Sequence, residues 1–278
     1  MKFNHKESEV IAEIRKLQSC NSALTIHSTS QASSGPLITG CEICMNKKYM
    51  SFQLGFRCNA RCAFCFLSSY QADKALEDEK YHRQASMKQF HRHKHELAGV
   101  SITGGEPLLY LPELAASVSE MKLSKPDLYF WIYTNGILAD EENLVFIRAL
   151  GIREIRFNLA ATNYSEKILK KVKLARNIFD YVAVEVPSYP KQKDMLIGCL
   201  VDLNRIGIDQ LNLQELLVTQ ANIDNLEGEG YQSGMFFLTK YFLYGSRKMS
   251  NEVMQHCVDK NYSFTVNDCS VTKLGRNL

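Results

Sequence analysis

The stretch SFQLGFRCNARCAFCF, residues Ser51 to Phe66, decides how the rest of this chain is interpreted. It opens with a run typical of a β-strand and ends with Cys58, Cys62 and Cys65, in the spacing Cys-x3-Cys-x2-Cys. This spacing follows neither a helical nor a strand period, which indicates a loop. A cubane iron–sulfur cluster normally takes four Cys ligands, so three cysteines leave one iron open to a ligand from outside the protein. We therefore expect Cys58, Cys62 and Cys65 to bind a [4Fe–4S] cluster, with a structural zinc site or buried thiols as the alternatives.

The composition is that of an ordinary globular protein. The 278 residues are 45% hydrophobic and 23% charged, and the net charge of +3 is too small to argue for a nucleic-acid partner. No apolar run approaches the roughly 20 residues of a membrane span, and the first residues, MKFNHKESEV, lack the apolar core of a signal peptide. We expect a cytoplasmic protein that binds no membrane, whose nine cysteines serve metal or redox chemistry rather than disulfides.

Six strand-like segments alternate with helix-like segments after residue 48. This alternation predicts parallel β/α units, and six of them make a partial barrel. In such barrels the chemistry lies at the carboxyl ends of the strands, and the Cys triplet directly follows the first strand. The expected strands are Tyr49–Phe56, Gly99–Thr103, Leu128–Thr134, Ile152–Leu159, Tyr181–Pro187 and Gln210–Leu216. The expected helices are Met87–Leu97, Leu111–Met121, Glu141–Leu150, Ser165–Ile178 and Gln192–Ile206.

The predicted fold class is α/β, a partial (β/α)6 barrel of parallel strands with an N-terminal extension and a small C-terminal α+β addition. The barrel is expected over residues 49–218, the extension over 1–48, and the addition, packing on the barrel, over 219–278. In the extension we expect a helix at Glu7–Gln18 and a loop at Ser19–Pro36. In the addition we expect a strand at Met235–Tyr244, a helix at Ser250–Lys260 and a strand at Tyr262–Val266.

The predicted strands place polar side chains on the face opposite their apolar residues. Successive residues of a strand face opposite sides, and the apolar sides should pack on the helices. A barrel interior that served only as core would be filled with branched apolar residues, so a polar interior favours a bound polar ligand. A few hydrogen-bonded buried polar groups are the alternative. The residues expected to point inward are Gln53, Ser101, Thr103, Arg156, Asn158 and Glu185.

The second expected strand ends in Thr103-Gly104-Gly105-Glu106-Pro107. Paired glycines let a backbone approach a ligand closely, and their carbonyls can accept hydrogen bonds from an ammonium group. Together with the Cys triplet, whose last Cys follows the aromatic Phe64, this turn resembles the signature of the radical S-adenosylmethionine (SAM) superfamily.

The resemblance implies a chemistry and a set of site residues. In that superfamily the open iron binds SAM, and the reduced cluster cleaves SAM to methionine and a 5′-deoxyadenosyl radical that takes a hydrogen atom from the substrate. Gly104, Gly105, Glu106 and Pro107 would bind the methionine end of SAM. Polar groups on the later strands would contact the rest of SAM, with Thr134, Asn135, Asn158, Glu185 and Gln214 as the candidates.

The layout from Gly40 to Lys273 is similar to a branch related to pyruvate formate-lyase activating enzymes, which leaves the substrate open. Our first expectation is a peptide or protein side chain, with an electron donor such as a flavodoxin or ferredoxin as partner. One alternative is a small-molecule dehydrogenase or epimerase acting on a sugar or amino acid. An epimerase needs a hydrogen donor, for which Cys199 and Tyr133 are candidates. A non-catalytic zinc-binding scaffold is the alternative from another class.

Four further cysteines form a second candidate metal site. Cys41 and Cys44 make a tight Cys-x2-Cys pair before the first strand, and Cys257 and Cys269 lie near the other end of the chain. If the two ends meet, these four thiols could hold an auxiliary iron–sulfur cluster or a zinc ion.

Overall fold

The computed structural model describes residues 24–28, 31–67, 76–226, 230–236 and 239–270. The chain divides into two compact units. Unit 1 comprises residues 1–37, 62–66 and 184–278, and unit 2 comprises residues 38–61 and 67–183. The predicted division at residues 48 and 218 stays a prediction, and the predicted helix Glu7–Gln18 lies outside the described residues.

The predicted α/β fold is confirmed. The strands pair in the order β1-β2-β12-β8-β7-β6-β5-β4-β3, a mostly parallel sheet that is not closed into a barrel within the described part of the chain. All six predicted strands are present, as β3 (Tyr49–Gln53), β4 (Gly99–Thr103), β5 (Tyr129–Thr134), β6 (Glu154–Phe157), β7 (Tyr181–Pro187) and β8 (Gln210–Gln214). The helices between them are α3 (Leu76–His93), α4 (Leu111–Ser124), α5 (Glu141–Ala149), α6 (Glu166–Arg176) and α7 (Lys193–Ile206).

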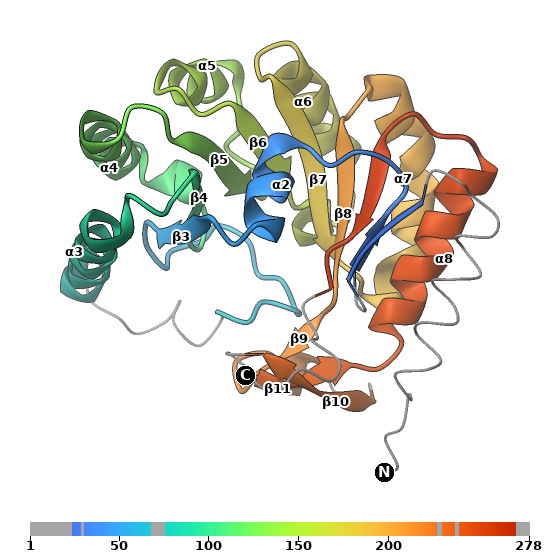
Figure 1. The fold of residues 1–278 in the computed structure, drawn as a ribbon. Helices are drawn as coiled ribbons and strands as arrows, with labels where there is room; N and C mark the ends of the chain where they lie inside the picture. Colours follow the sequence, from blue (N-terminus) through green and yellow to red (C-terminus); the bar gives the residue numbers. More distant parts are fainter. Residues whose placement is uncertain (1–23, 29–30, 68–75, 227–229, 237–238, 271–278) are drawn as a thin grey trace. The chain divides into compact units, whose positions relative to one another are not determined.

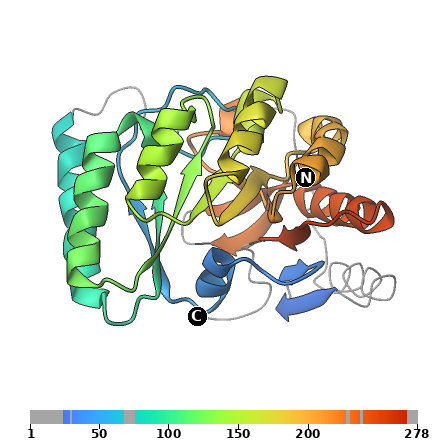
Figure 2. The same cartoon turned by 90° about the horizontal axis from the view of Figure 1, so that it is seen from above.

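In unit 2, helices cover one face of the parallel strands. The strands β3 to β6 run in parallel, with Tyr49 opposite Gly99, Gly99 opposite Tyr129, and Trp131 opposite Glu154. Helices α3 to α6 follow one another along one side of these strands, and the short helix α2 (Thr39–Met45) lies on the other side (Figures 1 and 2). Fully buried apolar side chains fill the helix-covered face, namely Phe52, Val100, Ile102, Phe130, Ile132, Ile155 and Phe157.

In unit 1, β8 continues the sheet toward strands from both ends of the chain. β12 (Thr265–Asp268) is parallel to β8, while β2 (Gln31–Ser33) is antiparallel to β12 and to β1 (Thr25–Ser28). Helix α8 (Ser246–Asp259) lies beside β12 (Figure 1). A second sheet pairs β10 (Tyr231–Phe236), β11 (Thr239–Leu243) and β9 (Leu217–Val218) in that order. The described residues also contain the 3-10 helices η2 (Pro107–Leu109), η3 (Leu159–Thr162), η4 (Pro190–Gln192) and η5 (Ile223–Leu226).

The structure corrects three local predictions. The expected loop Ser19–Pro36 contains the strands β1 and β2, and the expected strand Met235–Tyr244 belongs to the hairpin of β10 and β11. Helix α3 begins at Leu76, well before the expected Met87. Among the described residues, no helix is both long enough and apolar enough to cross a membrane.

The start of α5 depends on a side-chain cap. Asp140 precedes the helix, and its Oδ1 accepts a hydrogen bond of 3.0 Å from the backbone N–H of Asn143. Replacing Asp140 by Ala leaves this N–H without its acceptor and removes a negative charge from the positive end of the helix. We expect the free energy of unfolding to fall by about 1 kcal/mol, measured by urea unfolding. Asp140→Asn keeps an acceptor and is the matched control, so equal losses in both variants would contradict the capping role.

Candidate functional site

The segment that leads to Cys58 packs against the Gly-Gly-Glu-Pro turn in unit 2. Beyond β3, the N–H of Leu54 donates to the carbonyl of Thr103 at 2.9 Å. The N–H of Gly105 donates to the carbonyl of Gly55 at 3.0 Å, and the N–H of Glu106 to the carbonyl of Arg57 at 2.8 Å. The pairing of β3 with β4 therefore continues past both strand ends, up to the residue before Cys58.

The two glycines of the turn are needed for this close packing. A Cβ at Gly104, whose φ is +148°, would lie 2.6 Å from the carbonyl oxygen of Gly55. A Cβ at Gly105 would lie 2.2 Å from the carbonyl oxygen of Arg57. Any side chain at either position would push the two backbones apart. These glycines, expected from the sequence to let a ligand approach the backbone, also allow two segments of the chain itself to approach each other closely.

Glu106 is fully buried below the turn, where three donors surround its carboxylate. Oε2 accepts a hydrogen bond from the N–H of Asn135 at 2.8 Å, and Oε1 accepts from Thr134 Oγ1 at 2.8 Å and from the N–H of Leu108 at 3.1 Å. Burial raises the pKa of this carboxyl to about 7, although the three hydrogen bonds act in the opposite direction. The bond to Leu108 caps η2, and Pro107 occupies the first turn of that helix.

Asn135 connects the buried carboxylate of Glu106 to the Cys loop. Its backbone N–H binds Glu106, while its side-chain Nδ2 donates to Asn59 Oδ1 at 2.7 Å and lies 3.7 Å from Cys58 Sγ. Asn135 Oδ1 accepts a hydrogen bond from the N–H of Ile137 at 2.9 Å, which sets the orientation of the amide. Three stretches that the sequence analysis singled out, around Cys58, Glu106 and Asn135, are thus joined in one hydrogen-bonded network.

The environment of Cys58 combines burial with nearby donors. Burial raises the pKa of the thiol, and the charge of Glu106 adds to this effect. Hydrogen bonds from Ala60, Asn135 and Asn59 act in the opposite direction, and the N–H of Ala60 lies 3.4 Å from the sulfur. Such donors stabilise a thiolate, which is the form that binds iron.

Cys62 and Cys65 belong to unit 1 and share a turn. The N–H of Cys65 donates to the carbonyl of Cys62 at 3.1 Å. Between them, the carbonyl of Phe64 accepts a hydrogen bond of 3.0 Å from Asn222 Nδ2, which also donates to the carbonyl of Leu217 at 2.9 Å. Asn222 is fully buried. It was missed by the sequence analysis because nothing in its neighbourhood marks it apart from other loop asparagines.

Two candidate residues near the later strands make structural contacts. Asn158 caps η3, where its Oδ1 accepts from the N–H of Ala161 at 3.3 Å. In unit 1, Glu185 Oε2 accepts a hydrogen bond of 3.0 Å from Asn212 Nδ2. Asn212 Oδ1 in turn accepts hydrogen bonds from Gln210 Nε2 at 2.6 Å and Asn267 Nδ2 at 2.9 Å. A ladder of buried amides across β8 and β12 therefore orients the carboxylate of Glu185.

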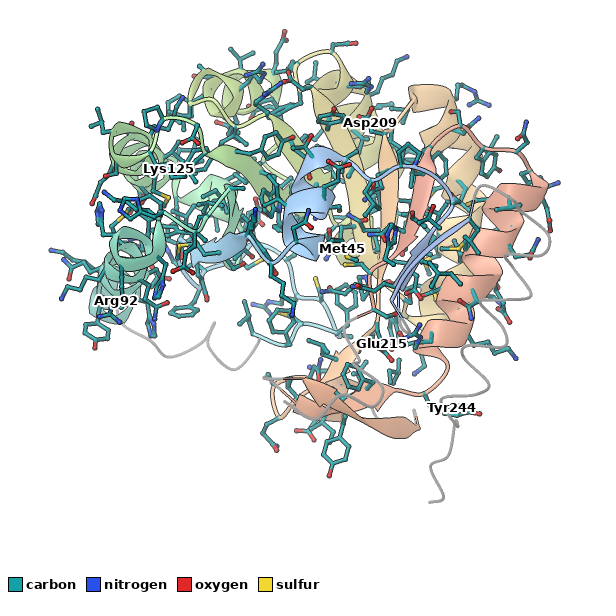
Figure 3. The ribbon with its side chains drawn as sticks, viewed as in Figure 1. Met45, Arg92, Lys125, Asp209, Glu215 and Tyr244 are labelled. Carbon is teal, nitrogen blue, oxygen red and sulfur yellow. The ribbon has the colours of Figure 1, made fainter. Side chains whose placement is uncertain are left out.

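Gln214 and Glu215, at the end of β8, differ in how deeply they are buried. Gln214 is half-buried, and its carbonyl accepts the N–H of Ser188 at 2.7 Å. Glu215, labelled in Figure 3 just beyond the end of β8, is 1% exposed. Gln214, a candidate SAM contact, is therefore the more accessible side chain of this pair.

Arg156, expected to point inward, forms a buried ion pair on the face that α2 covers. Its Nε and Nη2 lie 2.6 and 2.5 Å from Glu154 Oε1. Glu154 Oε2 accepts the N–H of Gly40 at 2.9 Å and the hydroxyl of Tyr129 at 3.1 Å. Arg156 Nη1 donates to the hydroxyl of Tyr133 at 3.1 Å. This polar cluster joins β5 and β6 to the start of α2, which is the structural alternative that the sequence analysis left open.

Cys199 and Tyr133, the two candidate donors of a hydrogen atom to a substrate radical, differ in how exposed their side chains are. Cys199 is 5% exposed in α7, and its thiol donates to the carbonyl of Leu196 at 3.1 Å. Burial raises the pKa of this thiol to about 12, with a smaller contribution from Asp202. These observations favour a buried structural thiol. Tyr133 is half-buried, and its hydroxyl accepts a hydrogen bond from Arg156. Its role as a donor of a hydrogen atom stays a prediction.

The second set of cysteines is divided between the units. Cys41 is buried and Cys44 half-buried in α2 of unit 2. In unit 1, Cys257 is buried in α8 and Cys269 follows β12, where its N–H donates to the carbonyl of Leu213 at 2.9 Å. Burial raises the pKa of the Cys257 thiol to about 12, and the nearby Cys199 contributes to the same effect.

The donor set of the Cys triplet fits a [4Fe–4S] cluster. Within the described residues, no three His, Cys, Asp or Glu side chains are already grouped as a metal site, and no cysteine forms a disulfide. Cys58, Cys62 and Cys65 are each half-buried thiols on a loop. Three sulfur donors suit iron–sulfur chemistry better than a hard cation.

Comparison with known sequences identifies a family and a relative. The Radical SAM superfamily model matches residues 52–184. A protein of Methanocaldococcus jannaschii, provisionally named a glycyl-radical enzyme activating enzyme, is 26% identical over 205 residues. The alignment covers 69% of this chain and 53% of the relative, so the chain spans about half the length of that relative.

Comparison with solved structures finds a similar fold in the protein SuiB of Streptococcus suis. The crystal structure of SuiB matches 81% of this chain and 49% of that chain, with a TM-score of 0.54 and 16% identity. SuiB bound to S-adenosylmethionine gives a TM-score of 0.54 at 14% identity, covering 81% of this chain and 50% of that chain. SuiB bound to the precursor peptide SuiA gives a TM-score of 0.55 at 13% identity, and the match covers 79% of this chain and 48% of that chain. At these identities the likeness shows the fold.

Proposed function

Because the Radical SAM superfamily model matches residues 52–184, we propose that this chain is a member of that superfamily and generates a 5′-deoxyadenosyl radical to modify a peptide or protein. Cys58, Cys62 and Cys65 hold a [4Fe–4S] cluster in this proposal. When bound, the cluster supplies the electron for reductive cleavage of SAM, and an external donor such as a flavodoxin or ferredoxin replaces that electron. The observation that carries the proposal is the network in which Asn135 contacts both Cys58 and the buried Glu106.

The residues of unit 2 prepare the site for this chemistry. Glu106 fixes the backbone of Asn135, and Asn135 directs an N–H toward the sulfur of Cys58. Hydrogen bonds to cluster sulfurs are one of the ways in which a protein sets a cluster's reduction potential. The turn at Gly104 and Gly105 lies against the backbone that enters the Cys loop, so residues that bind SAM in this proposal sit next to Cys58 along a rigid backbone contact.

Two comparisons support a peptide or protein as the substrate. The relative from M. jannaschii carries a name for enzymes that activate other enzymes, and SuiB was crystallised with a precursor peptide. In this chain, Gln214 and Glu185 are half-buried polar groups at the carboxyl ends of their strands, where a substrate side chain is expected to reach. The wider set of Cys41, Cys44, Cys257 and Cys269 remains our proposal for an auxiliary iron–sulfur cluster or zinc.

The test is an anaerobic assay of the reconstituted protein. Iron and sulfide are counted, the protein is reduced, SAM is added, and 5′-deoxyadenosine is quantified by chromatography. We expect about four iron atoms per chain from the triplet, or about eight if an auxiliary cluster also forms. Separate Cys58→Ala, Cys62→Ala and Cys65→Ala variants should each lose 5′-deoxyadenosine formation, because each removes one of three ligands.

Cys199→Ala is the matched control, since Cys199 is a buried thiol in α7 away from the triplet in sequence. It should keep both the iron and the product. Zinc in place of iron, or 5′-deoxyadenosine formation that survives loss of all three cysteines, would contradict the proposed function. If the reaction requires a substrate, incubation with candidate peptides should increase product formation, whereas sugars or amino acids doing so would favour the small-molecule alternative.

A further inference from the structure

A buried carboxylate and a buried tyrosine lie beside the entry segment, Gly55 to Arg57, that leads to Cys58. Oε1 of Glu79, near the start of α3, accepts hydrogen bonds from the N–H of Phe56 at 2.8 Å and, more weakly, from the N–H of Arg57 at 3.3 Å. The hydroxyl of Tyr110 donates to the same oxygen at 2.6 Å. Glu79 is 3% exposed and Tyr110 is fully buried, so water does not compete for these bonds.

Tyr110 also contacts the entry segment directly, in three ways. Its hydroxyl oxygen accepts the N–H of Arg57 at 2.7 Å, and the guanidinium of Arg57 lies 4.8 Å from the centre of its ring. The ring also covers Gly55, where a Cβ would lie 2.3 Å from Cζ of Tyr110. Gly55 is therefore a position that admits no side chain while Tyr110 occupies this place.

The charge state of Glu79 suits this arrangement. Burial acts to raise its pKa, but the hydrogen bonds from Tyr110, Phe56 and Arg57 outweigh burial and hold the pKa below its ordinary value. Glu79 is thus an ionised carboxylate, and hydrogen bonds to ionised acceptors are stronger than those between neutral groups.

The entry segment is consequently held from two directions. The turn at Gly105 and Glu106 binds the carbonyl groups of Gly55 and Arg57, while Glu79 and Tyr110 bind the N–H groups of Phe56 and Arg57. We propose that Glu79 and Tyr110 are positioning residues, which fix the backbone before Cys58 and so hold this ligand in place for the iron. This inference rests on the proposed function. Neither residue lies in a stretch that the sequence analysis singled out.

Four variants of the full chain test the proposal. Tyr110→Phe removes the hydroxyl that binds Arg57, and Glu79→Ala removes the shared acceptor. Glu79→Gln keeps one oxygen in place and is the conservative rescue. Tyr129→Phe is the matched control, because it also removes a buried tyrosine-to-glutamate hydrogen bond in unit 2, here to Glu154, without touching the entry segment.

Two measurements are made on each variant. The first is the rate at which a chelator removes iron from the anaerobically reconstituted protein. The second is hydrogen exchange at the N–H groups of Phe56 and Arg57. Loss of a partner that orients a metal ligand typically costs 10–100-fold in metal affinity. We expect iron loss at least about tenfold faster in Tyr110→Phe and Glu79→Ala, with faster exchange at both N–H groups. Glu79→Gln, which keeps an acceptor but loses the charge, should lie between wild type and Glu79→Ala, and Tyr129→Phe should lie near wild type.

Equal rates of iron loss in Tyr110→Phe and Tyr129→Phe would overturn the proposal, since any effect would then be general destabilisation. If the wild-type protein binds no iron, the proposed function fails. In that case, unchanged exchange at Phe56 and Arg57 in Tyr110→Phe and Glu79→Ala would also overturn the positioning role of Glu79 and Tyr110. Faster exchange there would support that role independently of iron binding.

Discussion

Replacing Glu154 by Leu is expected to lower the free energy of unfolding by about 3–5 kcal/mol, because it leaves a buried guanidinium without its counter-ion. Arg156 is 3% exposed and Glu154 is fully buried, and the two side chains share short contacts at Oε1 of Glu154. The aromatic rings of Trp131 and Tyr133, 5.3 and 5.4 Å from the guanidinium carbon, stabilise the charge only in part.

The same carboxylate also anchors α2. Its second oxygen accepts the N–H of Gly40 and the hydroxyl of Tyr129, and a Cβ at Gly40 would lie 2.7 Å from atoms of both Glu154 and Arg156. Losing the carboxylate therefore leaves two more buried donors unpaired. We expect α2, with Cys41 and Cys44, to become more accessible to thiol-modifying reagents in Glu154→Leu.

The control is the double variant Glu154→Leu with Arg156→Met, which removes both charges and replaces them with apolar side chains. Replacing both members of a buried ion pair often costs little, so the double variant should recover roughly 2 kcal/mol or more relative to Glu154→Leu alone. Urea unfolding of the four proteins of the double-mutant cycle supplies the coupling energy. A coupling energy near zero would contradict the view that the cost arises from the unpaired charge.

The β/α framework was predictable because its signal is local. Strands such as Gly99–Thr103 and Tyr181–Pro187 are marked by apolar and β-branched residues over a few positions, and the structure has them with the same bounds. Strand β2, with the sequence QAS, carries no such signal. It exists because Ala32 and Ser33 pair with Asp268 and Asn267 of β12, far away in the sequence, and tertiary pairing overrides weak local preference.

The candidate site was predictable in its motifs but not in its connections. Cys58, Glu106 and Asn135 could each be found at the end of a strand. That Asn135 would contact both of the others depends on the neighbouring positions of β4 and β5 and on the burial of a carboxylate. Glu79 lies before the expected start of its helix, and Tyr110 follows the turn like any core aromatic residue. Their roles arise only from long-range packing, which no spacing rule describes.

Glu106 is expected to make the free energy of unfolding depend on pH. Burial raises the pKa of Glu106 from 4.5 to about 7 in the folded protein. Below about pH 4.5 the carboxyl is protonated in both states, and its contribution to stability is fully present. As the pH rises, the unfolded chain releases this proton first, so stability is lost progressively until the folded carboxyl also ionises near pH 7. We expect a loss of roughly 3 kcal/mol over this interval, with no further change from this group above it.

Glu106→Gln isolates this contribution, because an amide does not titrate in that range. Urea unfolding of iron-free wild type and variant, at matched pH values from 5 to 8, should give curves that diverge below about pH 7, with the wild type gaining stability relative to the variant as the pH falls. The two proteins differ at this residue alone, so the difference between the curves belongs to Glu106. Parallel curves would show that the hydrogen bonds from Asn135, Thr134 and Leu108 outweigh burial and keep the carboxylate ionised. The two outcomes differ in structure as well, since a protonated carboxyl must give its hydrogen to the Thr134 hydroxyl, the one partner that can accept it.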